Sequence, residues 1–191
     1  MKIRHILPAV LIVSMFLTGC QTSEISTFDR DTIELAKDQS LTYTIVTDFE
    51  ESYYDVDELT QMADEEADQT GLGIRVQSAE VTAGVIRFTY EMDSASDYET
   101  FMDTSCYLGT ISSAFDDNYR LKVTVNSVKD DSQIILSDVS RTDYDIFIWN
   151  EVIAVCCPGK IMYFSTNLEL TDDYSVAPLS ESTGPYYVVY K

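Results

Sequence analysis

The sequence predicts an α+β protein with N-terminal hairpins, two or three short helices and a β-rich C-terminal part. Three observations carry this prediction: short runs of alternating apolar and polar residues, one longer run with apolar residues three and four apart, and closely spaced apolar runs after residue 143. A period of two is typical of strands and a spacing of three and four is typical of helices. Apolar residues make up 45% of the 191 residues, which is enough for a packed core rather than a disordered acidic tail.

The first ordered element is expected to be a hairpin. Asp31–Ala36 places Ile33 and Leu35 on one face, and Leu41–Thr47 alternates in the same way. The polar link Lys37–Ser40 between these runs favours antiparallel pairing. A second hairpin shows the same signs, with strands and a connection at Ile74–Val81, Val85–Met92 and Thr82-Ala83-Gly84.

A helix is predicted over Val56–Gln69, because its apolar residues recur on one helical face. Asp55 followed by Glu58 is typical of a helix start, and Gly71 of a helix end. The apolar face consists of Val56, Leu59, Met62, Ala63 and Ala67.

Two shorter helices are predicted further along the chain. Ser96–Asp103 begins with a capping box, Ser96-x-x-Glu99, and its apolar side is formed by Tyr98, Phe101 and Met102. Thr110–Phe115 is the second.

Strands are predicted for most of the remaining chain. Pro158-Gly159 favours a type II turn between two of them. We expect residues 29–191 to form a single α+β domain, although a boundary at Lys129–Ser132 is an alternative. The expected strands are Leu121–Asn126, Asp145–Trp149, Val152–Cys156, Ile161–Ser165, Leu168–Thr171 and Tyr186–Tyr190.

The N-terminus carries the features of a bacterial lipoprotein. Ile6–Leu17 is apolar but shorter than the roughly 20 residues that a membrane-spanning helix needs. Leu17-Thr18-Gly19-Cys20 resembles a lipobox, which implies that residues 1–19 are a signal peptide and that Cys20 becomes the diacylglyceryl-modified first residue. Residues 20–28 are then a short tether. This predicts a lipid-anchored protein on the extracytoplasmic face of the cell membrane.

Charge and histidine content exclude several functions. The formal net charge is −21 and the pI is near 4.1, which argues against nucleic acid as a partner because phosphate binding needs a basic patch. Cleavage would remove Lys2 and Arg4 and change the charge to −23. It would also remove His5, the single histidine. A mature chain without imidazole excludes Ser-His-Asp catalysis, Cys-His catalysis and histidine-bearing zinc sites.

Three further segments have distinctive sequences: the strand at Thr42–Phe49 (TxTIVxDF), the helix start at Tyr53–Leu59 (YYDxDEL) and the strand at Pro158–Ser165 (PGKIMYFS). Together with the lipobox, these segments are similar to a group of lipoproteins from Gram-positive gut bacteria. The resemblance implies a Gram-positive cell surface. It assigns no activity and no catalytic residue, because that group has no assigned function.

Ten acidic residues and no basic residue lie within Asp48–Asp68. Several crowd the C-terminal end of the predicted helix, which is the negative end of its dipole, so a cation would relieve the repulsion. A hard-cation site and a solvated acidic face are the two interpretations, and the spacing lacks the pattern of an EF-hand. The candidate ligands are Asp55, Asp57, Glu58, Asp64 and Asp68.

Three cysteines remain once Cys20 is modified. Cys156 and Cys157 follow an apolar run, which predicts buried free thiols. A disulfide between Cys106 and one of these two cysteines is an alternative. Thirteen tyrosines suggest a sugar-binding platform as a further possibility. Trp149, however, lies in a run that predicts burial on both faces, so we assign it to the core.

No S-x-x-K, G-x-S-x-G or phosphate-binding loop occurs, so the sequence predicts neither an enzyme nor a cofactor. The leading hypothesis is a non-enzymatic surface lipoprotein that acts by binding or assembly. A small carbohydrate- or cell-wall-binding module, a weak divalent-cation-binding domain and a subunit of a membrane complex are the alternatives.

Overall fold

The structure is a computed structural model that describes residues 30–50, 55–140 and 143–191. The protein is an α+β protein in which strands dominate over helices. In the described ranges none of the helices is both long and apolar enough to cross a membrane. The α-helices are α1 (Val56–Thr70), α2 (Ala95–Phe101) and α3 (Ile111–Asp116), with a 3₁₀ turn at Leu136–Asp138.

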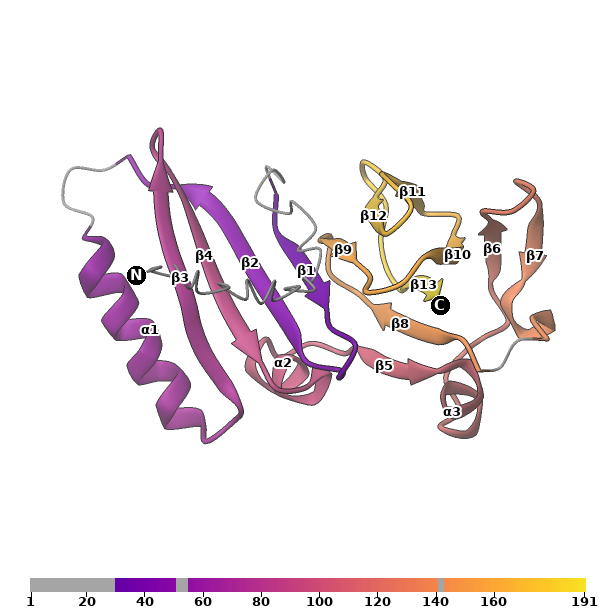
Figure 1. Cartoon of the computed structure of the whole chain (residues 1–191), viewed down its shortest axis with the longest axis horizontal. Helices are drawn as coiled ribbons and strands as arrows, with labels where there is room; N and C mark the ends of the chain where they lie inside the picture. Colours follow the sequence, from indigo (N-terminus) through magenta and orange to yellow (C-terminus); the bar gives the residue numbers. More distant parts are fainter. Residues whose placement is uncertain (1–29, 51–54, 141–142) are drawn as a thin grey trace, which may run out of the picture.

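Seven strands form the first sheet, in the order β11-β12-β9-β1-β2-β4-β3. Figure 1 shows α1 beside β3, at one end of the molecule. The bounds are β1 Thr32–Leu35, β2 Leu41–Asp48, β3 Ile74–Thr82, β4 Val85–Met92, β9 Ala154–Cys156, β11 Leu168–Leu170 and β12 Ser175–Pro178.

Six strands form the second sheet, in the order β5-β8-β13-β10-β6-β7. In Figure 1, β6 and β7 lie at the end of the molecule opposite α1. The bounds are β5 Tyr107–Thr110, β6 Thr124–Ser127, β7 Gln133–Ile135, β8 Asp145–Trp149, β10 Ile161–Ser165 and β13 Tyr186–Tyr190.

One parallel strand pair joins the two halves of the chain. β1 pairs with β2 on one side in an antiparallel hairpin and with β9 on the other side in parallel, with Ile33 opposite Val155. The remaining strand pairs in the described residues are antiparallel. The C-terminal half also crosses between the sheets, because β9, β11 and β12 belong to the first sheet and β8, β10 and β13 to the second.

The two sheets share one apolar core. Tyr43 and Met92 of the first sheet belong to the same buried cluster as Phe147, Trp149 and Tyr186 of the second. The opposite face of the second sheet buries a separate cluster that includes Ile146, Ile148 and Tyr187. β8 and β13 are therefore buried on both faces, which confirms the assignment of Trp149 to the core and places the adjacent Tyr186 and Tyr187 in different clusters.

Most predicted elements are confirmed. Both N-terminal hairpins are present, and Asp55 caps α1 by accepting hydrogen bonds from the backbone N–H groups of Asp57 and Glu58. Gly71 ends the same helix in the left-handed conformation, at φ 67°. The proposed boundary at Lys129–Ser132 is the connection between the paired strands β6 and β7.

The predicted apolar face of α1 is wrong in part. Leu59 and Met62 are 36% and 61% exposed, whereas Ala63 and Ala67 are buried. The helix packs against the core through Ala63, Ala67 and the half-buried Val56, whereas Leu59 and Met62 are exposed to solvent.

Three further predictions need correction. α2 is capped by Ser94 rather than Ser96, because Ser94 accepts from the N–H of Asp97 and bonds to its carboxylate. Strand β6 begins at Thr124 instead of Leu121. The type II turn predicted at Pro158-Gly159 is not formed. Such a turn requires a positive φ at Gly159, whereas the described glycines with positive φ are Gly71 and Gly84.

The buried hydroxyl group of Tyr98 is expected to lower the stability of the fold. Tyr98 is 0% exposed and its ring meets that of Tyr43 edge-on at 5.5 Å, but its hydroxyl has no hydrogen-bond partner among the described residues. Tyr98→Phe keeps the ring contact and removes a group that is costly to bury. We expect it to raise the free energy of unfolding by about 1 kcal/mol in a denaturant titration.

The matched control is Tyr187→Phe, because the Tyr187 hydroxyl donates a hydrogen bond of 3.0 Å to the carbonyl oxygen of Arg120. This substitution should lower the free energy of unfolding by about 1 kcal/mol. Equal losses in both variants would show that the Tyr98 hydroxyl is satisfied.

Candidate functional site

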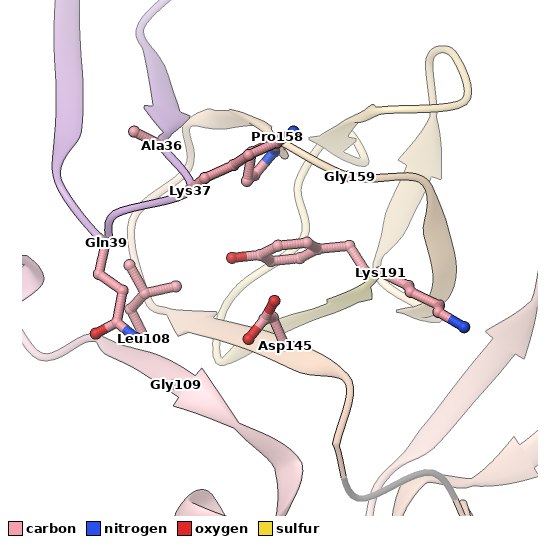
Figure 2. Close-up of a pocket in the computed structure, with 10 residues that line it drawn as sticks. Ala36, Lys37, Gln39, Leu108, Gly109, Asp145, Pro158, Gly159 and Lys191 are labelled. Carbon is pink, nitrogen blue, oxygen red and sulfur yellow. The ribbon is translucent and has the colours of Figure 1, made fainter.

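A pocket of about 380 Å³ lies where the two sheets meet. It has the size of a small-molecule site. Figure 2 shows its walls, which come from the β1–β2 hairpin, β5, β8, the segment after β9 and the end of β13. The lining residues are Ala36, Lys37, Gln39, Leu108, Gly109, Asp145, Pro158, Gly159, Tyr190 and Lys191.

The parallel pairing of β1 and β9 places two of these walls together. Because the strands run in the same direction, their carboxyl ends lie at the same edge of the sheet. β1 leads into Ala36 and Lys37, and β9 leads into Pro158 and Gly159. Segments more than a hundred residues apart in sequence thus lie side by side on one side of the pocket, opposite Asp145.

The β1–β2 turn holds its pocket residues in a fixed conformation. The N–H of Ala36 donates to the carbonyl of Ser40, and the N–H of Gln39 donates to the carbonyl of Ala36. Gln39 adopts a left-handed conformation with φ 72°, as the last position of a three-residue hairpin loop requires. Asp38 accepts hydrogen bonds from the hydroxyl and N–H of Ser40, and these bonds lower the pKa of Asp38.

Gly159 allows the segment after β9 to approach Lys191 closely. A Cβ atom at this glycine would lie 2.4 Å from the carbonyl oxygen of Lys191. Lys160 and Lys191 exchange two backbone hydrogen bonds of 3.0 Å, which extend the pairing of β10 with β13. Gly159 is therefore needed for close backbone contact rather than for the turn that the sequence predicts.

Asp145 is the acidic group in the wall of the pocket. It begins β8, whose four following residues are all buried, and it pairs with Tyr190 of β13 and Thr110 of β5. Burial raises the pKa of the Asp145 carboxyl group. Burial also raises the pKa of Tyr190, with smaller contributions from Cys157 and Asp145.

Opposite charges line the pocket without being paired. Figure 2 shows the Asp145 carboxylate pointing into the space between the walls and Lys37 extending along the other side toward Pro158. The ion pairs of the described residues involve neither of these two side chains. The ammonium group of Lys191 lies 5.5 Å from the ring centre of Tyr144 and points away from the pocket.

A second hollow, of about 390 Å³, lies against β6 and β7. It offers one carboxylate, from Asp138, and no basic side chain to oppose it. The pocket between the sheets is therefore the better candidate, because it combines both charges with apolar side chains.

The five acidic residues that the sequence singles out are not brought together. Asp55, Asp57 and Glu58 lie at the start of α1, and Asp64 and Asp68 follow two to four turns later. In the described part of the chain, no three His, Cys, Asp or Glu residues form a group suited to a metal ion. The carboxylate of Asp55 serves as the helix cap instead.

The three described cysteines are buried, free thiols. The hydroxyl of Ser175 donates to the sulfur of Cys156 at 3.3 Å, and the thiol of Cys106 donates to the carbonyl of Ala95 at 3.4 Å. Burial raises the pKa of both Cys106 and Cys156 to about 12, and it raises that of Cys157 as well. These thiols are packing residues rather than nucleophiles.

Cys20, the lipobox and the tether lie outside the described residues, as do Tyr53 and Tyr54 at the start of the segment Tyr53–Leu59. Neither Lys37 nor Asp145 stood out as a site residue in the sequence. A signal did exist for Asp145, since it is the single charged residue in the run Asp145–Trp149. Lys37 carries no comparable signal, because lysine is ordinary in a hairpin turn.

The first prediction for the site concerns Asp145→Asn. A buried carboxyl group with a raised pKa binds its proton more tightly in the folded state, so its contribution to stability falls as the pH rises above about 4. The amide removes this cost, and thermal unfolding at about pH 7 should occur at a higher temperature than in the wild type. Near pH 3, where Asp145 is protonated in both states, the difference should vanish.

The control is Asp64→Asn, which makes the same change in net charge on the exposed surface of α1. An equal gain in this variant would attribute the effect to general charge repulsion and would contradict the prediction.

The second prediction concerns the thiols. The three buried cysteines of the mature protein should not react with a disulfide reagent at about pH 8, because almost no thiolate is present. After denaturation, three equivalents should react. A single equivalent would reveal a disulfide and contradict the free state of these residues.

Comparisons with known proteins found no matching family model, curated protein or solved structure.

Proposed function

We propose that the protein is a non-enzymatic, lipid-anchored protein of the extracytoplasmic membrane face that acts by binding a small polar ligand. The observation that carries the binding activity is the pocket between the two sheets, where the unpaired charges of Lys37 and Asp145 stand on different walls. Ligand sites are commonly largely preformed, with a few polar groups set among apolar ones.

The sequence around Cys20 supports the anchor. Two acyl chains on this residue hold a protein stably at a membrane, whereas one chain gives marginal binding. Cys20 and Asp31 are eleven residues apart, a distance of at most about 38 Å for an extended chain. The pocket would therefore operate close to the membrane. The resemblance of three segments to surface lipoproteins supports the same location.

The pocket favours a small polar ligand over a sugar. Carbohydrate platforms use exposed rings, whereas the aromatic residue that lines this pocket, Tyr190, is 4% exposed. Phe115 and Tyr174 are the exposed rings of the described residues, and neither lines the pocket.

Lipidation at Cys20 provides a direct test of the anchor. In a bacterium that processes lipoproteins, the wild type should incorporate labelled palmitate and partition into the detergent phase. Cys20→Ser should lose both properties, because serine cannot form the thioether.

Cys106→Ser is the matched control, since it also removes one thiol but lies in the folded domain. Retention of label in Cys20→Ser, or its loss in Cys106→Ser, would overturn the proposed anchor.

A further inference from the structure

We infer that the ligand of the pocket is a small amino-acid-like zwitterion, with its ammonium group against Asp145 and its carboxylate against Lys37. This inference rests on the proposed function and assigns a chemical class to the ligand. It follows from the two charges, the apolar residues that line the same pocket and the fixed backbone that presents each charge.

Asp145 provides the site for the ammonium group. Its carboxylate is half-buried on a strand that is otherwise fully buried, and no described residue donates a hydrogen bond to it or forms an ion pair with it. A carboxylate that is partly removed from water without a partner is costly. A ligand ammonium group would supply both the missing charge and the missing hydrogen-bond donors.

Lys37 provides the site for the carboxylate. Its backbone lies in the hairpin loop that the Ala36–Ser40 hydrogen bonds hold, so the side chain starts from a fixed position. It is exposed and forms no ion pair with a described residue. Lys37 and Asp145 form no ion pair with each other and stand on different walls of a pocket of about 380 Å³, a size suited to a small ligand that carries both charges.

The pocket also has apolar lining residues. Ala36, Leu108 and Pro158 line it, and these residues suit an aliphatic side chain or stem. Lys191 does not compete for the ligand carboxylate, because its ammonium group lies over Tyr144. The strongly acidic protein repels simple anions, so a ligand carboxylate needs the accompanying ammonium group to bind well.

Four probes separate the contributions of the two charges. Leucine carries both, 3-methylbutylamine is leucine without its carboxylate, and 4-methylpentanoate is leucine without its ammonium group. 4-Aminobutanoate places the two charges further apart. We expect calorimetry with the lipidated protein in detergent to show at least tenfold tighter binding of one of the two zwitterions than of either singly charged probe.

Two variants test the residues. Asp145→Asn and Lys37→Gln should each weaken binding of that zwitterion at least tenfold. The controls Asp64→Asn and Lys122→Gln make the same charge changes at exposed positions and should bind like the wild type. Thermal unfolding of each variant shows that it is folded.

The outcomes distinguish the inference from the proposed function. If a singly charged probe binds as tightly as both zwitterions and a pocket variant abolishes its binding, the pocket is functional but the zwitterion assignment is wrong. Equal weakening by the control variants also overturns the assignment. If no probe binds, the zwitterion assignment is overturned. If a wider set of sugars, nucleosides and organic acids also fails to bind, the proposed function is overturned as well.

Discussion

The parallel pairing of β1 with β9 is the interaction on which the rest of the structure depends. It joins four N-terminal strands, in the order β1-β2-β4-β3, to three strands from the C-terminal half, and so builds one seven-stranded sheet from two separate parts of the chain. Ile33 and Val155 meet in this pairing, and both are 0% exposed. Without it, each part would expose an unpaired strand edge together with a half-covered apolar face.

The crossing of the C-terminal chain between the sheets follows from the same pairing. β8 belongs to the second sheet, β9 to the first and β10 to the second again. Every crossing ties the two sheets to one core, in which Phe147 and Trp149 stack with ring centres 5.2 Å apart. The pocket lies where the chain makes one of these crossings, between β9 and β10, so its shape is set by the packing of both sheets.

The local features of this fold could be predicted from the sequence, and the long-range features could not. Asp145–Trp149, Ile161–Ser165 and Tyr186–Tyr190 are found with the predicted bounds, because a run of β-branched and aromatic residues indicates a strand without reference to its partners.

Other elements depend on contacts that no local pattern records. β12 contains Ser175 and ends in Pro178, and it is a strand because it pairs with β9 and β11. Gly159 follows a proline, which predicts a turn. In the structure its missing side chain instead lets the backbone of Lys191 pack closely against it. The pocket itself joins residues from five segments, so its members could be recognised only once β1 and β9 were known to be paired.

Asp145 differs from several other polar residues of the described chain, because no hydrogen bond or ion pair of the described residues involves its carboxylate. Asp55 caps a helix, Asp38 fixes a hairpin, and the three thiols pack in the core. Asp145 instead begins a buried strand with a partly buried charge that the described fold leaves uncompensated. An apolar residue or an asparagine at this position would serve the sheet better. In natural proteins, residues that oppose the stability of the fold occur mainly where function requires them. The Asp145 carboxylate is therefore the strongest reason to regard the pocket as a binding site.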